Sequence, residues 1–449
     1  MMKLIIITIL CTCVLGFGGW YEVDVHQEDI LKAADYGTKT LGYQLNTPFH
    51  IKLEHIHKAK QQVVAGMNYR LDITVGLTTC KKDEVKYEEI HQCEFQDGDN
   101  TYRKCELLLF RNLKGDYKLT KFDCFEKKNE GTPKKITFHK ERMMFYDFAM
   151  KYNKEYKSEE EREARFRVFQ RNLRKINYLN DFERGTAKYG VTAFADLTET
   201  EFKKYRLGLR PDLAPENDVM PIAEIPVDPI PQSFDWREKD VVSEVKDQGQ
   251  CGSCWAFSTT GNIEGQWAIK KKKLVSLSEQ ELVDCDKVDE GCNGGLPSNA
   301  YKEIIRLGGL EGEKDYPYEG TDDKCEFNKT DVRVYINSSV AISQNETEMA
   351  AWLVKNGPIS IGINANAMQF YFGGISHPWK FLCSPDNLDH GVLIVGYGVH
   401  TYPLFKTTLP FWIIKNSWGA SWGEQGYYRV YRGDGTCGLN KMATSSVIN

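Results

Sequence analysis

The spacing of apolar residues along the chain predicts both helices and strands. Near the start, Ile30 and Leu41 lie on or near one face of residues 24–44, which predicts an amphipathic helix. In the next two segments, residues 49–60 and 67–78, apolar and polar side chains roughly alternate. Such alternation is typical of strands, and the apolar sequence QVVAG between them predicts a hairpin with an exposed tip.

A helical period also marks the middle of the chain. Six residues are spaced 4, 4, 3, 4 and 4, which places them along one face of a helix: Glu161, Arg165, Phe169, Asn172, Ile176 and Asn180. Because Glu161 and Arg165 form an i,i+4 pair, a salt-bridged surface helix is one interpretation.

The remaining sequence is helical first and strand-rich afterwards. Four residues spaced 4, 3 and 4 predict a helix over residues 254–271: Ala256, Thr260, Ile263 and Trp267. Ser278 and Glu281 predict a capping box, and Pro297 predicts the start of a helix that ends near Gly308. Four apolar or β-branched runs predict strands at residues 359–363, 392–397, 411–415 and 427–431.

The first residues resemble a targeting segment rather than a structural element. Lys3 precedes a mostly apolar run over residues 4–15, and glycines follow from Gly16. This pattern predicts a secretory signal peptide over residues 1–16. No later stretch reaches 18 uninterrupted apolar residues, so no membrane span is expected.

Composition adds constraints of size, charge and redox state. A chain of 449 residues has room for about three domains, and a net charge of -5 does not predict a nucleic-acid partner. Thirteen cysteines in a secreted chain predict disulfides. Two cysteines fall in the signal peptide, four in residues 80–124 and seven in residues 251–437. The odd group leaves one thiol unpaired, and the sequence alone leaves several pairings of the others open.

One of these cysteines has the position of a nucleophile. Cys254, in QGQCGSCWAF, falls at the N-terminus of a predicted helix, where unpaired amides and the helix dipole stabilise a thiolate. His390 and Asn416 follow it by 136 (390 − 254) and 162 (416 − 254) residues. The alternatives are a Cys251–Cys254 redox or zinc pair, a core histidine and a turn asparagine. A redox or zinc pair is disfavoured because no second CxxC exists and the compartment is oxidising.

Four motifs together identify a family. CGSCWAF, GCNGG, DHGV and KNSWG occur in this order, and residues 229–449 resemble a papain-like cysteine protease, in particular the cathepsin F group of that family. The resemblance implies an α+β fold in which a helical lobe carrying Cys254 faces a β lobe carrying His390 and Asn416. It implies no cofactor and no metal.

The resemblance also implies a role for each residue of the site. Cys254 would attack as a thiolate beside an imidazolium at His390, and Asn416 would orient that ring. Gln248 and the Cys254 amide would bind the oxyanion. Trp418 would shield the ring from water.

A substrate cleft follows from the same resemblance. Gly294 and Gly295 would let the substrate backbone approach closely. Five residues would line the S2 pocket, namely Leu296, Pro297, Gly362, Gly391 and Met442, although ordinary core and turn positions are the alternative interpretation. This lining predicts bulky apolar side chains in S2, and the absence of an occluding insertion predicts an endopeptidase of protein and peptide substrates. Cystatin-type inhibitors would be partners.

The same resemblance implies three disulfides in residues 229–449. They are Cys251–Cys292, Cys285–Cys325 and Cys383–Cys437, and they leave Cys254 free.

Residues 17–127 resemble a cystatin, an inhibitor that places a glycine region and a QxVxG hairpin in a papain-like cleft. The resemblance implies the pairs Cys80–Cys93 and Cys105–Cys124. The Pro-Trp of the family's second hairpin is absent between Cys105 and Cys124. A retained cystatin fold with a folding or targeting role is therefore the alternative to an inhibitor.

Residues 128–228 resemble the inhibitory propeptide of papain-like proteases. The six-residue helical pattern matches its ERFNIN motif, and Gly190, Thr192, Phe194 and Asp196 match GxNxFxD with threonine for asparagine. The propeptide would lie along the cleft in the direction opposite to a substrate and act as an intramolecular inhibitor. Six prolines between residues 211 and 231 predict an exposed linker, where cleavage would release the enzyme.

Sequons begin at Asn328, Asn337 and Asn345 and predict a glycosylated protein of the secretory pathway, either lysosomal or extracellular. Two function classes follow. One is an endopeptidase made as a zymogen, and the other is an inhibitor or binding protein that keeps the protease half as a scaffold.

Overall fold

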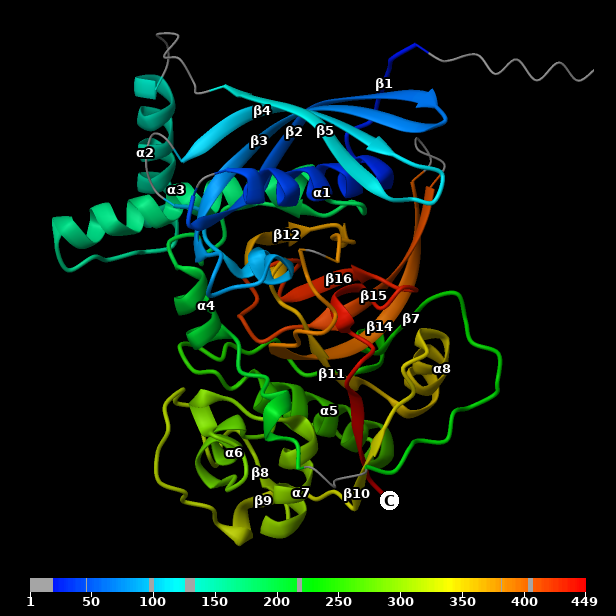
Figure 1. Cartoon of the computed structure of the whole chain (residues 1–449). Coiled ribbons are helices and arrows are strands. Elements are labelled where there is room, and N and C mark those ends of the chain that lie inside the picture. Colours follow the sequence, from blue (N-terminus) through cyan, green and yellow to red (C-terminus); the bar gives the residue numbers. More distant parts are fainter. Residues whose placement is uncertain are drawn as a thin grey trace, which may run out of the picture. The chain divides into compact units, whose positions relative to one another are not determined.

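The computed structural model describes residues 19–45, 47–96, 101–125, 134–215, 220–380, 382–402 and 407–449. The predicted signal peptide, residues 1–16, lies outside the described residues. The chain forms two compact units, Met1–Pro133 and Lys134–Asn449 (Figure 1). Among the described helices, none has the length and apolarity needed to cross a bilayer.

The first unit is an antiparallel sheet with one helix. Its elements are β1 Tyr21–Val23, α1 Glu28–Gln44, β2 Phe49–Val64, β3 Gly66–Lys81, η1 Tyr87–Gln92, β4 Tyr102–Arg111 and β5 Tyr117–Phe125. The strands follow in the order β1-β2-β3-β4-β5. Ile30 and Leu41 of α1 are fully buried, and Gly37 of α1 faces Leu107 of β4, so the predicted apolar face packs on the sheet.

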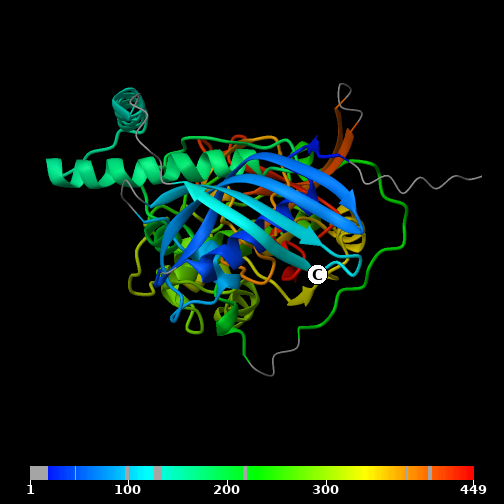
Figure 2. The same ribbon diagram turned by 45° about the horizontal axis from the view of Figure 1, so that its top comes forward.

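The hairpin in this unit is longer and tighter than the sequence predicts. β2 runs on to Val64 and β3 begins at Gly66, so QVVAG lies inside the hairpin instead of forming a separate loop (Figure 2). Gly66 has a φ of 136°, and a Cβ there would lie 2.3 Å from the Arg111 carbonyl oxygen. Only glycine therefore fits this turn. The pairs Cys80–Cys93 and Cys105–Cys124 are bonded, as the cystatin resemblance implies.

The second unit begins with three helices. They are α2 Lys134–Lys151, α3 Glu159–Asp181 and α4 Glu199–Arg206, with β6 Lys188–Tyr189 between the last two and η2 Pro211–Leu213 after them. The predicted helical face of α3 packs inward through Phe169, Asn172 and Ile176. The Asn172 side-chain amide donates to the carbonyls of Ala195 (2.8 Å) and Leu197 (2.9 Å), which fixes the following loop on α3.

The rest of the second unit combines helices with a sheet. The helices are α5 Cys254–Lys271, α6 Glu279–Cys285, α7 Pro297–Leu307 and α8 Glu346–Asn356, with the 3-10 turns η3 Trp236–Lys239, η4 Gly291–Asn293, η5 Lys329–Asp331, η6 Met368–Phe370 and η7 Thr436–Gly438. The strands are β7 Phe234–Asp235, β8 Leu310–Glu311, β9 Val332–Val334, β10 Ser338–Ala341, β11 Ile359–Ile363, β12 Tyr371–Gly373, β13 Ile375–Ser376, β14 His390–Tyr402, β15 Thr407–Lys415, β16 Tyr427–Tyr431 and β17 Ala443–Val447.

Most of these strands join one sheet, in the order β10-β17-β11-β14-β15-β16-β13, with β7 paired to β14. α5 contributes Trp255, Ala256 and Ile263 to a helical core, and it also reaches the sheet. There the Ser258 hydroxyl donates to the Val392 carbonyl at 2.7 Å. The predicted α+β fold is confirmed, and the four predicted strands are β11, β14, β15 and β16.

The predicted linker is largely extended and exposed. After the short turn η2, the Ile222 side chain is 79% exposed and that of Val227 is 99% exposed. Its described residues make one contact of strand type, a parallel bridge between Ile222 and Ala341.

Candidate active site

Two strands of the sheet bring His390 and Asn416 together. His390 is the first residue of β14, and Asn416 follows the last residue of β15. The strands are antiparallel, with Leu393 opposite Lys415, so the two residues lie at the same end of the sheet. His390 Nε2 and Asn416 Oδ1 are 2.7 Å apart, and both side chains are buried.

The N-terminus of α5 places Cys254 beside this pair. Cys254 is the first helical residue and the only free cysteine among the described residues. Its sulfur accepts a hydrogen bond from the amide of Gly391 at 3.3 Å. A Cβ at Gly391 would lie 3.2 Å from the Cys254 carbonyl oxygen and 3.3 Å from the Trp255 backbone. Glycine at this position therefore lets the start of β14, which His390 begins, approach the helix closely.

In this structure residues 208–210 lie over Cys254, which makes it the closed form of the site. Burial keeps the Cys254 thiol and the His390 imidazole neutral in this form. It raises the pKa of Cys254 to about 12, against the opposing effect of backbone amides that include those of Gly391 and Gly208. Burial lowers the pKa of His390 to about 4, although its bond to Asn416 acts in the other direction. This state differs from the thiolate and imidazolium that the sequence suggests, because desolvation disfavours both charges.

Gln248 and Trp418 flank the three residues. The Gln248 side chain is buried, donates to the Cys251 carbonyl at 2.9 Å and accepts from the Ser417 hydroxyl at 2.8 Å. The Trp418 ring stacks on His390 with centroids 4.7 Å apart and an angle of 27°. Trp418 therefore covers one face of the imidazole.

A segment of the propeptide-like region covers the sulfur. The amides of Gly208 and Leu209 both donate to the Asp389 carbonyl at 3.2 Å. Gly295 donates to the Gly208 carbonyl at 2.9 Å and accepts from the Arg210 amide at 3.0 Å, which makes a parallel bridge between Leu209 and Gly295. The segment is thus held on both sides of Cys254 by backbone hydrogen bonds.

Leu209 fills an apolar hollow next to the sulfur. Its Cδ2 lies 2.7 Å from where a Cβ of Gly362 would be, and Leu388 and Met442 line the same position at 3.3 and 3.5 Å. Gly362 and Met442, two of the residues predicted for S2, thus lie together at this hollow, and Leu388 is a further residue of it. No motif in the sequence marks Leu388, because it lies just before the DHGV motif, which begins at Asp389.

The other predicted cleft residues lie at the start of α7. Leu296 is its N-cap and is fully buried, and Pro297 is its first residue. Gly294 lies under Arg210, whose Cγ is 2.6 Å from where a Gly294 Cβ would be.

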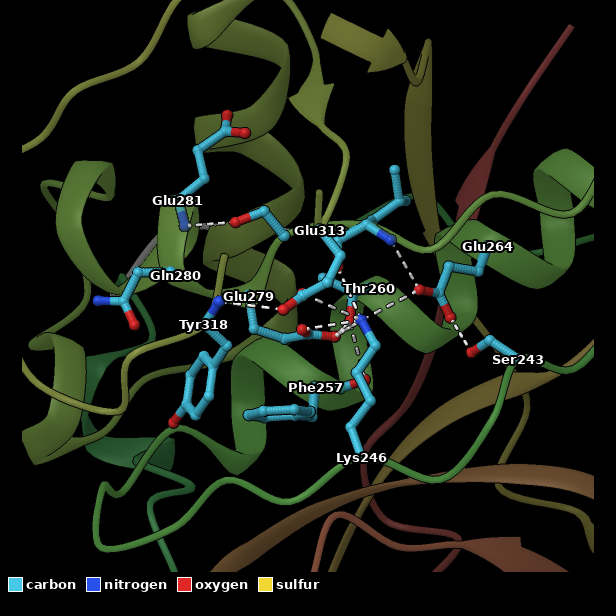
Figure 3. A network of polar contacts seen from close by, with 12 residues as sticks. Ser243, Lys246, Phe257, Thr260, Glu264, Glu279, Gln280, Glu281, Glu313 and Tyr318 are labelled. Carbon is cyan, nitrogen blue, oxygen red and sulfur yellow. Dashed lines mark hydrogen bonds and ion pairs between the residues drawn. The ribbon is translucent and has the colours of Figure 1, made fainter. Parts of the chain in front are cut away.

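A network of buried charges lies behind α5. The Lys246 ammonium group is 2.9 Å from both carboxylate oxygens of Glu279 and 3.5 Å from Glu264 and Glu313 (Figure 3). Burial lowers the pKa of Lys246, but the carboxylates raise it more strongly, so it stays above its ordinary value. The small cavity lined by Lys246 and Glu279 also reaches Asn416. No motif in the sequence announces this network, because its members come from separate segments.

The structure bonds Cys251–Cys292, Cys285–Cys325 and Cys383–Cys437, the pairs that the family resemblance implies. Asn328, Asn337 and Asn345 are all exposed. Within the described ranges, no group of three histidine, cysteine or acidic side chains is arranged to hold a metal ion.

Three family profiles match the chain in succession. Residues 18–129 match the cystatin domain, residues 145–202 the cathepsin propeptide inhibitor domain (I29), and residues 230–447 the papain family cysteine protease.

Characterised relatives match over most of the chain. Cathepsin F of Drosophila melanogaster is 46% identical over 420 residues, which cover 89% of this chain and 65% of that protein. Cathepsin F of Mus musculus is 53% identical over 307 residues, 68% of this chain and 65% of that protein. The chain therefore spans about two thirds of the length of these two relatives. It covers 85% of cysteine proteinase 15A of Pisum sativum, to which it is 46% identical over 311 residues.

Solved structures of proenzymes also match. Digestive procathepsin L 3 of the Tenebrio molitor larval midgut is 34% identical with a TM-score of 0.60, over 69% of this chain and 99% of that one. The recombinant stem bromelain precursor is 31% identical with a TM-score of 0.61, over 69% of this chain and 99% of that one.

Proposed function

The chain belongs to the papain family of cysteine proteases, and from this membership we propose that it is a cysteine endopeptidase made as a zymogen. Cys254 is the nucleophile, His390 the acid and base, and Asn416 the group that orients the imidazole. The residues preceding the protease inhibit it from within the same chain.

The reaction is an acyl transfer through a thioester. His390 takes the proton of the Cys254 thiol, and the sulfur attacks the carbonyl carbon of the peptide bond. His390 then gives this proton to the leaving amine, which breaks the C–N bond. A water molecule attacks the thioester while His390 removes its proton, and the returning proton regenerates the thiol as the acid product leaves. The bond to Asn416 holds Nε2, which leaves Nδ1 for these transfers.

The oxyanion is held by the Gln248 side-chain amide and the Cys254 backbone amide. In the closed form the Gln248 amide donates to the Cys251 carbonyl, so it is already held close to the nucleophile. Loss of one such donor costs about 10²- to 10³-fold in kcat in a well-studied protease.

One observation carries the proposal. The Cys254 sulfur accepts from the amide of Gly391, the neighbour of the histidine that is bonded to Asn416, and the protein's own residues 208–210 lie over this sulfur with backbone hydrogen bonds on either side. A buried binding scaffold has no need for such a cover. The arrangement therefore favours an enzyme that is held inactive over an inhibitor with a residual protease half.

The hollow occupied by Leu209 supports an S2 pocket for bulky apolar side chains. Gly362 and Met442 contribute to it without charge, together with Leu388. Peptide and protein substrates with leucine at this position are favoured over those with arginine. The exposed sequons are consistent with glycosylation in the secretory pathway, with a lysosomal or extracellular destination. Cystatin-type inhibitors are the expected protein partners of the open cleft.

The test is a cleavage assay on the full chain after processing at acid pH. Peptides with leucine in the S2 position are hydrolysed, and Cys254→Ala lowers kcat/KM by at least about 10³-fold because no nucleophile remains. Turnover of Leu and Arg peptides at that position is compared in the same assay. Equal hydrolysis by wild type and Cys254→Ala would rule out the mechanism, and a preference for arginine would rule out the apolar pocket.

A further inference from the structure

Two arginines flank the segment that covers Cys254, and both bind carboxylates of the protease region. Arg206 Nη1 donates to Asp247 Oδ1 at 2.7 Å, and Arg210 Nη1 donates to Glu290 Oε2 at 2.8 Å. The arginines belong to the residues that maturation removes, whereas Asp247 and Glu290 stay with the enzyme. Residues 206–210, Arg-Leu-Gly-Leu-Arg, thus span the cleft with an arginine at each end, and Arg210 also donates to Asp212 at 2.8 and 2.6 Å.

The position of Glu290 relative to the cleft follows from Leu209. The Leu209 side chain fills the apolar hollow beside Gly362, and its backbone pairs with Gly295. Arg210 is one residue further from Cys254 and lies over Gly294. Glu290 therefore faces Arg210, the residue that follows Leu209 along the segment. A substrate that runs in the opposite direction and uses the same hollow presents its third residue before the scissile bond at this place.

Asp247 has the corresponding position at the other end of the segment. The Trp418 indole donates to the Arg206 carbonyl at 3.1 Å, which fixes Arg206 beside the ring that covers His390. If Gly208 stands over the sulfur in place of the last residue before the scissile bond, Arg206 takes the place of the second residue after it. Asp247 forms an antiparallel bridge with Trp418, so it lies on the same side of the site as Arg206.

Removal of the propeptide takes away the cations that these carboxylates bind. Within the described part of the chain, Asp247 forms an ion pair with Arg206, and Glu290 forms one with Arg210. The Asp247 and Glu290 side chains are 53% and 47% exposed even while the arginines cover them. Removal of the arginines therefore leaves the carboxylates of Asp247 and Glu290 accessible at the two ends of the cleft.

We propose that Asp247 and Glu290 make the mature cleft selective for peptides with basic side chains at the third residue before the scissile bond and the second residue after it. The inference rests on the proposed function and adds charge to the apolar preference of S2. The preference for basic side chains is expected to be modest, because both carboxylates are exposed. Solvent-exposed ion pairs contribute up to about 1 kcal/mol, which corresponds to roughly fivefold in kcat/KM at each position.

The test of Glu290 uses the full chain processed at acid pH and peptides with leucine in the S2 position. The peptides differ only at the preceding residue, which is arginine, leucine or glutamate. We expect the arginine peptide to be cleaved with a kcat/KM about threefold to fivefold above that of the leucine peptide, with the glutamate peptide below both. Glu290→Gln brings the arginine-to-leucine ratio close to one, and Glu290→Lys brings it below one. Added salt lowers the wild-type ratio, because exposed charges are screened.

The matched control is Glu348→Gln, which removes one exposed carboxylate from α8 and leaves activity and the ratio unchanged. For the other end of the cleft, peptides with arginine or leucine at the second residue after the scissile bond are compared in wild type and Asp247→Asn. The amide oxygen of asparagine still accepts from the Gly249 amide, as Asp247 does now.

The outcomes separate the inference from the function on which it rests. If the arginine and leucine peptides are cleaved equally well by wild type, or if Glu290→Gln and Glu348→Gln behave alike, the charge selectivity is wrong while the peptidase remains. If no peptide is cleaved by the processed wild-type chain, the proposed function fails and the inference fails with it.

Discussion

Two glycines allow separate segments to meet at the Cys254 sulfur. Gly391 brings β14 against the start of α5, where a side chain would meet backbone atoms of Cys254 and Trp255. Gly208 brings the covering segment down on Gly252, since a Cβ at Gly208 would lie 1.8 Å from the Gly252 carbonyl oxygen. Neither contact is with a flexible side chain, so the backbone itself would have to move.

Gly208→Ala is therefore expected to loosen the closed form. Overpacking of this kind costs about 1–3 kcal/mol, so the population in which the sulfur is accessible should rise by roughly fivefold to 150-fold. The measurement is the alkylation rate of Cys254 in the full chain near neutral pH, followed by mass spectrometry. Gly19→Ala is the control, because a Cβ there meets no atom within 4 Å. An unchanged rate would show that the segment does not close on Gly252.

At the scale of elements, α5 is held by polar contacts as well as by its apolar face. Thr260 of α5 donates to Glu279 of α6 at 2.5 Å, and Glu264 of α5 accepts from the Leu277 amide at 2.9 Å. Lys246 joins both carboxylates from the segment that precedes α5 (Figure 3). The buried Lys246 ammonium group thus links α5, which carries Cys254, to α6.

Lys246→Met is expected to destabilise the protein by about 3–5 kcal/mol, because it leaves the carboxylates of Glu264 and Glu279 buried without their counterion. Urea unfolding of the full chain measures the change. Lys239→Met, at an exposed position, should shift the midpoint little. A loss below about 1 kcal/mol at Lys246 would mean that these carboxylates are protonated or hydrated in solution.

At the scale of the whole second unit, proton binding is linked to opening of the cleft. In the closed form burial lowers the pKa of His390 to about 4 from an ordinary value of 6.5. When the covering segment leaves, the imidazole regains solvent and its pKa rises. Between about pH 6.5 and 4 His390 therefore binds up to one proton more in the open form than in the closed form, so the titration of His390 favours opening as the pH falls.

Protonation of His390 should thus shift the free energy of opening by up to about 3 kcal/mol toward the open form, since each tenfold change in proton affinity corresponds to about 1.4 kcal/mol. Hydrogen–deuterium exchange of residues 206–210 in a Cys254→Ala chain measures opening without self-cleavage. Protection should fall steadily from about pH 6.5 to 4 and level off below. Burial raises the pKa of Glu183 and raises that of Asp389 to about 6, and both groups act in the opposite direction, so His390→Gln in the same background isolates the histidine. Identical pH profiles for the two chains would contradict the prediction.

Much of the second unit could be predicted from local sequence. The period of Ala256, Thr260 and Ile263 predicted a helix over residues 254–271, and α5 spans Cys254–Lys271. The capping box predicted at Ser278 is only half formed. The Ser278 hydroxyl accepts from the Glu281 amide, but the Glu281 carboxylate accepts from the amide of Glu311 instead of capping α6. A partner brought in from another segment outcompeted the local one.

By itself the sequence determined what depends on near neighbours and on counting: the helical and strand periods, the odd number of cysteines, and Cys254 at a helix start. Its motifs also indicated the family and the disulfide pairs. Only the tertiary structure decided the neutral state of Cys254 and His390, the place of Leu388 in the hollow, and the pairing of Asp247 and Glu290 with two propeptide arginines. These depend on burial and on contacts between residues about 40 to 180 apart in the chain, and no local pattern encodes which distant segments will exclude water from one another.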